Sequence, residues 1–219
     1  VITPALFRKN PSPSLFDAVG MVNGVRPQIN CSVCNTGDIH INGMEGPYTM
    51  VLIDGMPIVS GLSTVYGLSG IPTSLVERVE IVKGPGSSLY GSEAMGGLVN
   101  VITKDPVLAP RAVVDLMATT YQEYNAAIGL RFGQKKVSDL LGVSVFNYSV
   151  PVDHNNDGFT DVTLQERVSL FNKFTVRRPD SKVASIAVRY VHEDRWGGDM
   201  KWTPAFAGSD SLYGENIAT

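Results

Sequence analysis

The second half of the chain alternates apolar and polar residues, and this pattern restricts the fold more than any other feature of the sequence. The alternating segments are 112–121, 125–132, 141–145, 166–176 and 184–190. In 166–176 one face carries Val168, Leu170, Phe174 and Val176, and the other carries Arg167, Ser169, Lys173 and Thr175. Segments of about ten residues with a period of two are typical of strands in outer-membrane barrels. The second half is therefore predicted to form consecutive antiparallel strands.

The connections between these strands differ in length. Those at 133–136 and 178–180 are tight, whereas those at 150–164 and from 193 onward are long. Short turns at one end of the strands and long loops at the other are typical of a transmembrane barrel. A soluble antiparallel sandwich also alternates and is the competing interpretation. Because closing a barrel takes at least about eight strands, we expect these five to be part of a longer protein.

The first half mixes helix and strand signals. Residues 12–23 are predicted to form a helix that Ser14 caps, with Asp17 three residues further on as in a capping box. A short helical turn is expected at 72–76, and strands are expected at 38–41, 48–53, 76–82 and 98–103. Helices and strands that interleave in this way indicate a small α+β domain.

Several classes of protein are disfavoured by the sequence. No apolar run reaches the length of about 18 residues that a transmembrane helix needs. Barrel strands need no such run, because they are short and alternate in polarity. A net charge of −3 gives no support for nucleic-acid binding. No nucleophile motif such as G-x-S-x-G is present, so the chain is not expected to be an enzyme.

One part of the first half carries a specific series of motifs. The run 51–57 reads VLIDGMP, Ile71-Pro72 follows, and the runs 75–85 and 88–104 read LVERVEIVKGP and SLYGSEAMGGLVNVITK. In order and spacing this series resembles the plug domain of TonB-dependent outer-membrane receptors. Two positions depart from the family. Asn42 stands where an arginine usually precedes glycine, and Lys83 stands where arginine is commoner.

The resemblance implies a fold, a function and a location. Residues 1–104 would form an α+β plug domain, a small mixed sheet with short helices. Residues 105–219 would form the first antiparallel strands of an incomplete transmembrane β-barrel. The parent protein would lie in the bacterial outer membrane, with its barrel in contact with lipid and the plug inside the barrel. It would take up a scarce large solute such as a ferric siderophore, haem or cobalamin, without a required cofactor. TonB would engage a segment that precedes this sequence.

Two other functions stay open at this point. A glycan importer of the same fold would work with a surface lipoprotein. A soluble binding or adhesion module stabilised by calcium would stand by itself and would not need a membrane.

By the same resemblance, plug loops that point outward would touch the solute. These loops are 28–38, 43–48 and 58–68, and the candidate contacts are Val33, Asn35, Met44, Glu45, Ser60, Leu62, Thr64 and Tyr66. The alternative is that these residues only shape the top of the plug while barrel loops bind the solute. Four further residues are expected to face polar groups of the barrel wall, namely Glu77, Arg78, Glu80 and Lys83.

The loop after residue 150 carries a separate signal. Asp153, Asn155, Asp157 and Asp161 supply oxygen atoms at alternating positions, with a glycine at the sixth position, as at the start of a calcium loop. Phe159 would add its carbonyl oxygen. The twelfth position is Leu164 rather than glutamate. The sequence therefore predicts a possible Ca²⁺ site, with a solvated Asn/Asp turn as the alternative.

Cys31 and Cys34 form the only cysteine pair, in a C-x-x-C motif. Their neighbours are typical of a loop rather than of the start of a helix, which disfavours a thioredoxin-like redox site. In an exported chain a disulfide is the favoured state, because that compartment is oxidising. Two unreactive buried thiols are the alternative.

Overall fold

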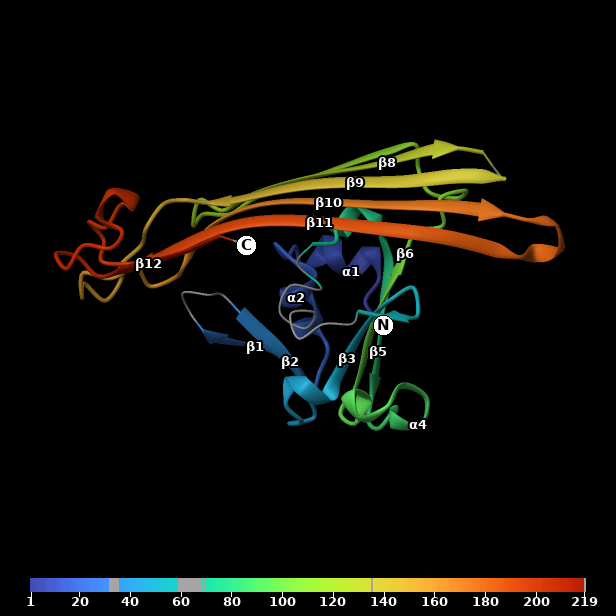
Figure 1. Ribbon diagram of the computed structural model, residues 1–219, viewed down its shortest axis with the longest axis horizontal. Coiled ribbons are helices and arrows are strands. Elements are labelled where there is room, and N and C mark those ends of the chain that lie inside the picture. Colours follow the sequence, from blue (N-terminus) through green and yellow to red (C-terminus); the bar gives the residue numbers. More distant parts are fainter. Residues whose placement is uncertain (32–35, 59–67, 69, 135, 219) are drawn as a thin grey trace.

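A computed structural model of the chain describes residues 1–31, 36–58, 68, 70–134 and 136–218. It consists of a mixed domain, formed by the elements from α1 to β6, that lies against one face of a long antiparallel sheet formed by the strands from β7 to β12 (Figure 1). Among the described residues, no helix is both long and apolar enough to cross a membrane.

The mixed domain begins with two short helices, α1 (Pro4–Lys9) and α2 (Leu15–Ala18), followed by a 3₁₀ turn, Val19–Met21. Strands β1 (Val25–Cys31) and β2 (Thr36–Ile41) then form an antiparallel pair. A second sheet has the order β4-β3-β6-β5, and its strands are β3 (Thr49–Ile53), β4 (Met56–Pro57), β5 (Val76–Lys83) and β6 (Gly97–Thr103). Strands β3 and β6 are parallel, so the sheet is mixed. The short helix α4 (Ser87–Tyr90) lies between β5 and β6.

The mixed domain has a core of its own. Leu15 of α2 and Val19 of the following 3₁₀ turn pack with Ile39 and Ile41 of β2 and with Val99 of β6, and all five side chains are buried. Removing apolar side chains from water is the main favourable contribution to folding. The helices and both small sheets are therefore joined into one domain by residues of the first half of the chain.

The second half forms one six-stranded antiparallel sheet whose strands follow one another in chain order. They are β7 (Ala112–Ala118), β8 (Tyr124–Gly133), β9 (Val137–Tyr148), β10 (Leu164–Arg177), β11 (Val183–Gly198) and β12 (Gly214–Ala218). We call the end at which residues 149–163 and 199–213 connect strands the long-loop end, and the opposite end the short-turn end. The sheet is not closed into a barrel, because β7 and β12 form its two edges.

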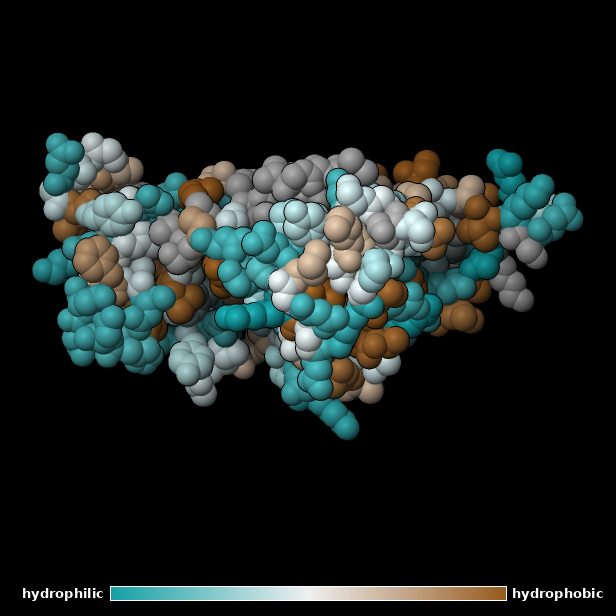
Figure 2. Space-filling model, turned by 90° about the horizontal axis from the view of Figure 1, so that it is seen from below, coloured by the Kyte–Doolittle hydropathy of each residue, from teal (hydrophilic) through white to brown (hydrophobic). Residues whose placement is uncertain are grey.

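The two faces of this sheet differ in the way that the alternation predicts. On the face away from the mixed domain, large apolar side chains are exposed, for example Ile186 at 69% and Val188 at 58%. The face toward the mixed domain carries polar side chains such as Arg167, Ser169 and Thr175, which are buried. Seen from below, hydrophilic residues gather at both ends of the sheet (Figure 2). An apolar outer face between two polar ends is typical of a strand that spans a bilayer.

The mixed domain meets the sheet at a hollow formed by two glycines. Gly129 of β8 and Gly142 of β9 are opposite each other in the sheet, and Leu75 of the mixed domain lies over them. A Cβ atom on Gly142 would be 2.4 Å from the Cδ1 atom of Leu75, closer than two carbon atoms can approach. Leu75 is buried there together with Leu140 and Phe171 of the sheet. Glycine at these positions therefore lets the domain sit close to the sheet.

Most elements agree with the predictions from the sequence, with a few differences. The capping box of Ser14 and Asp17 is confirmed, but the helix predicted at 12–23 is shorter, since α2 ends at Ala18 and a 3₁₀ turn replaces the rest. Helix α1 and strand β1 were not predicted. The five strands predicted for the second half are present, and β12 is a sixth.

Candidate functional site

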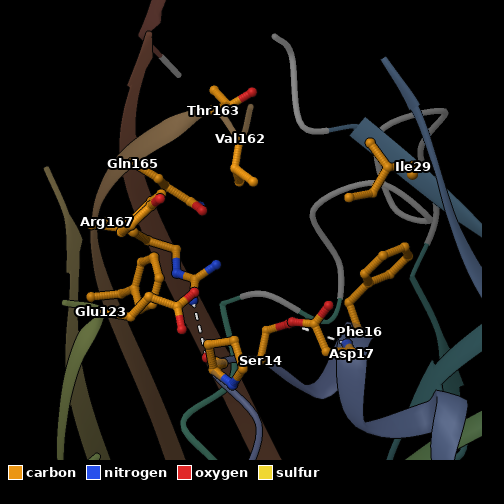
Figure 3. Close-up of a pocket in the computed structure, with 13 residues that line it drawn as sticks. Ser14, Phe16, Asp17, Ile29, Glu123, Val162, Thr163, Gln165 and Arg167 are labelled. Carbon is orange, nitrogen blue, oxygen red and sulfur yellow. Dashed lines mark hydrogen bonds between the residues drawn. The ribbon is translucent and has the colours of Figure 1, made fainter. Parts of the chain in front are cut away.

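A cavity of about 350 Å³ lies between the mixed domain and the long-loop end of the sheet. The mixed domain contributes residues at the start of α2 and in the β1–β2 pair, and the sheet contributes residues of β9, β10 and the adjoining loops. Figure 3 shows Phe16, Asp17 and Ile29 on one side of this cavity and Gln165 and Arg167 on the other. Here the two parts of the chain enclose space near the long loops.

The start of α2 is held in a fixed geometry. Ser14 is the N-cap, and its side-chain oxygen accepts a hydrogen bond from the Asp17 backbone N–H at 3.3 Å. The Ser14 hydroxyl in turn donates to an Asp17 carboxylate oxygen at 2.6 Å. A cap of this kind satisfies N–H groups that a helix leaves unpaired at its first turn. The Asp17 carboxylate is thereby positioned at the cavity while it remains exposed.

The opposite wall is built around Arg167 of β10. Its guanidinium donates to the carbonyl oxygen of Pro13 at 3.2 Å and lies 5.3 Å from the centroid of the Phe146 ring. The residue is only 7% exposed. Its neighbour across the strand pair is Glu193 of β11, which forms an ion pair with Arg195 at 2.8 Å, and both side chains of that pair are 2% exposed. A row of buried charges thus lies on the wall beside the cavity.

Glu123, from the β7–β8 connection, is the second carboxylate at the cavity. It is half-buried, and it accepts a hydrogen bond from the Thr119 hydroxyl at 2.9 Å. In the described part of the chain, neither Glu123 nor Asp17 forms a salt bridge with a lysine, arginine or histidine. The cavity therefore has one covered cation, Arg167, whose charge attracts Asp17 without forming a salt bridge, and a second carboxylate, Glu123.

A second polar contact joins the mixed domain to the sheet near the short-turn end. The Lys173 ammonium of β10 donates to Asp54 at 2.7 Å and to the Thr103 hydroxyl at 2.9 Å. Asp54 begins the turn between β3 and β4, and its carboxylate also accepts the Thr103 backbone N–H at 2.9 Å. The Asp54 and Lys173 side chains are 27% and 14% exposed, so water screens this pair only in part.

The link between the two parts is fixed by another ion pair, between Asp105 and Arg177, at 2.6 Å. Burial by itself would raise the pKa of the Asp105 carboxyl. The hydrogen bond from the Val107 N–H and the charge of Arg177 outweigh burial, so the pKa of Asp105 is lowered. The carboxylate is therefore ionised at neutral pH and holds the link to β10.

The eight predicted solute contacts have different outcomes. Val33, Asn35, Ser60, Leu62, Thr64 and Tyr66 lie outside the described residues. Met44 and Glu45 lie just before the 3₁₀ turn Gly46–Tyr48, at the end of the mixed domain remote from the sheet, and they do not line the cavity (Figure 1). From the predicted loop 28–38, Ile29 and Gly37 do line it. Solute contact by these eight residues stays a prediction.

The four residues expected to face the barrel wall have partners within the mixed domain. Arg78 forms ion pairs with Glu77 and Glu80, both at 2.7 Å, and its hydrogen bond with Glu80 raises the pKa of the guanidinium. The Lys83 ammonium donates to the Asn23 carbonyl oxygen. Glu77 also lines a hollow together with Lys173, Thr175 and Arg177 of β10. Contact of the four residues with the barrel wall stays a prediction.

The structure describes only one of the two cysteines. Cys31 is the last residue of β1, and Cys34 lies outside the described residues. A disulfide between them stays a prediction.

Sequence reasoning did not select Arg167, Glu123 or Lys173 as site residues. The sequence did indicate that Arg167 and Lys173 face away from lipid, because both lie on the polar face of the alternating segment 166–176. The sequence also marked Asp54, since it belongs to the motif VLIDGMP. Nothing in the sequence distinguishes Glu123 from an ordinary turn residue.

Comparison with known proteins finds similarity in the first half of the chain and in the fold. Residues 1–98 match the family described as TonB-dependent Receptor Plug Domain. The whole fold is similar to that of the siderophore receptor PirA from Acinetobacter baumannii, with a TM-score of 0.65 and 21% sequence identity. That match covers 90% of this chain and 32% of PirA.

Two further solved structures agree. The siderophore receptor PiuA from Acinetobacter baumannii matches with a TM-score of 0.67 and 18% identity over 89% of this chain and 26% of PiuA. The ferric yersiniabactin uptake receptor FyuA from Yersinia pestis matches with a TM-score of 0.63 and 15% identity over 90% of this chain and 31% of FyuA. The chain thus spans about a third or less of the length of these receptors, and at such identities the likeness concerns the fold.

Proposed function

We propose that this chain belongs to the TonB-dependent receptors of the bacterial outer membrane, and that the whole protein takes up a siderophore-type metal chelate. The protein is a transport receptor and not an enzyme. We propose that residues 1–104 are the plug and that residues 105–219 are the first strands of the barrel wall.

The observation that carries this proposal is the position of the cavity. It lies where the plug meets the long-loop end of the sheet, which is the extracellular end of such a barrel. A solute that arrives from outside would meet Phe16 and Asp17 of the plug and Glu123 of the wall in one place. The exposed apolar face, with residues such as Ile186 and Val188, supports a lipid environment, because a large apolar surface is unfavourable in water.

In this function the plug closes the barrel and has to move for the solute to pass. The contacts of Asp54 with Lys173 and of Pro13 with Arg167 would hold the plug against the wall at its two ends. We propose that TonB supplies the work that breaks such contacts, by pulling on a segment that precedes Val1. The solute itself is expected to add contacts with the plug at the cavity.

Uptake of radioactive iron into cells that carry the full-length receptor tests this function. We expect the receptor to restore uptake from at least one ferric chelate in cells that lack their own iron receptors. Removal of TonB should reduce that uptake to background, because the plug then stays in place. Unchanged uptake without TonB would contradict the proposal, and so would a receptor that restores uptake of no chelate.

Calcium is proposed for the loop 153–161 on the strength of its sequence motif. In the described geometry the Asp153 carboxylate accepts backbone N–H groups of Asp157 and Gly158, and Asp161 accepts that of His154. The described residues contain no group of three or more His, Cys, Asp or Glu side chains that could hold a metal ion. Binding of Ca²⁺ would therefore require these carboxylates to exchange backbone donors for the ion.

Calorimetric titration of the full-length receptor with CaCl₂ decides this point. We expect a saturable heat with a Kd on the order of 0.1–1 mM, as in other extracellular calcium modules. The double substitution Asp153→Asn and Asp157→Asn should abolish the heat, whereas Asp210→Asn, in the neighbouring long loop, should not. The absence of heat from the folded wild-type receptor would leave the solvated turn as the correct interpretation.

A further inference from the structure

The charges that a ligand can reach in the cavity are mainly negative. Among the described residues that line the cavity, Arg167 is the only cation, and it is 7% exposed. Its guanidinium is engaged by the Pro13 carbonyl oxygen and the Phe146 ring, and it faces Glu193 across the strand pair. Asp17 is exposed and Glu123 is half-buried, so both carboxylates are more accessible than the guanidinium.

These two carboxylates also have capacity for further donors. Each accepts a hydroxyl hydrogen bond, Asp17 from Ser14 and Glu123 from Thr119. An ionised carboxylate offers about four acceptor positions. Neither residue forms a salt bridge in the described part of the chain, although the charge of the covered Arg167 acts on Asp17. A ligand group with a positive charge and several N–H donors would satisfy both requirements.

The remaining lining favours the same kind of group. Phe16 and Tyr148 place two aromatic rings at the cavity, beside the Phe146 ring that Arg167 already covers. The faces of aromatic rings attract cations through their quadrupole. Figure 3 shows Asp17 and Glu123 on opposite sides of the cavity, so an approaching cation would pass between a plug carboxylate and a wall carboxylate.

We propose that this cavity selects chelates that carry a protonated amine, and that Asp17 and Glu123 bind the ammonium group. The inference rests on the proposed uptake function and narrows its substrate class. It distinguishes amine-bearing chelates from chelates whose periphery is neutral or anionic. The metal and its chelating oxygens would lie outside the cavity, toward the long loops and the rest of the barrel.

The test compares pairs of ferric chelates that differ only in one amine. Each pair consists of a chelate with a free terminal amine and its N-acetylated form, and the pairs are built on trihydroxamate, tricatecholate and hydroxycarboxylate chelators. Binding to the purified full-length receptor is measured by calorimetry, and uptake of radioactive iron is measured in cells. Acetylation removes the charge but keeps the chelate, so the ratio of the two dissociation constants isolates the ammonium contribution.

We expect the wild-type receptor to bind the amine form of its preferred pair about 5- to 30-fold more tightly, the range of one to two charge-assisted contacts at a partly exposed site. Glu123→Gln and Asp17→Asn should each reduce this preference, and together they should abolish it without weakening the acetylated form. Glu166→Gln is the matched control, because Glu166 lies on the same strand as Arg167 but on the outward face. The Glu166→Gln variant should prefer the amine form over the acetylated form as strongly as the wild type does.

The outcomes separate this inference from the function on which it rests. If the receptor takes up chelates but binds both members of every pair equally, or prefers the acetylated form, the ammonium proposal is wrong and the uptake function stands. If the preference survives in the double variant, Asp17 and Glu123 are not its cause and the proposal is also wrong. If no pair is bound or taken up, the uptake function fails and the inference fails with it.

Discussion

Replacing Gly142 with valine is expected to lift the plug from the barrel wall. The added Cβ atom alone would be 2.4 Å from the Leu75 side chain, and the two methyl groups of valine would fill the hollow that Leu75 now occupies. Overpacking of this kind costs about 1–3 kcal/mol. The population of receptors with a displaced plug should therefore rise about 5- to 150-fold.

Ion conductance of the full-length receptor in a planar bilayer measures this displacement, because a seated plug blocks the barrel. Gly142→Val should open channels far more often than the wild type, while the boiling-dependent gel shift of the closed barrel is retained. Adding Leu75→Ala should restore part of the block, since it empties the space that valine takes. Ala126→Val is the control, because Ala126 is exposed on the sheet. An unchanged conductance in Gly142→Val would show that the contact of Leu75 with the two glycines does not hold the plug against the wall.

The second large effect on plug displacement is expected from Lys173, at another contact between the plug and the barrel wall. Lys173→Met removes the ammonium that donates to Asp54 and Thr103 and leaves both acceptors without that partner. Loss of one partner of a largely covered charged hydrogen bond costs about 1–3 kcal/mol. The plug should therefore unseat more readily, and the force needed to pull it out should fall.

Single-molecule pulling on the N-terminus of the full-length receptor gives the most direct measurement. We expect a lower extraction force for Lys173→Met and an unchanged force for Lys182→Met, whose side chain is exposed in the turn after β10. Combining Asp54→Asn with Lys173→Met should cost less than the sum of the two single changes, because both remove the same contact. Full additivity would mean that the two residues act independently, contrary to the geometry.

Much of the fold follows from local patterns. The alternation in 166–176 gave both the strand and its two faces, because side chains in a strand point to opposite sides in turn. Strand β1 was missed since Pro27 and the polar residues around Asn30 are typical of a loop, and β1 is tolerated as a strand because it pairs with β2 alone. Strand β12 was missed because five residues, Gly214–Ala218, are too few for a clear period.

The cavity could not be predicted from the sequence. It depends on which residue of β10 stands beside which residue of the plug, and the contact between Pro13 and Arg167 joins positions 154 residues apart. Nothing in the local sequence of either residue encodes that separation. The motif that includes Asp54 marked the residue, whereas its partner Lys173 emerged only from the register of β10 on the plug.

The row of β10 side chains that holds the plug bears on the order in which the receptor assembles. Pro13, Asp54 and Asp105 contact residues of β10 that lie 154, 119 and 72 residues further along the chain. The main core cluster of the plug, in contrast, contains only residues between Ile2 and Val101. Contacts between distant residues form late, because closing a long loop costs entropy before the contact repays it. The plug is therefore expected to acquire its core as an early folding unit. Its docking on β10 would be a later and slower step, in which an already folded plug binds to the wall.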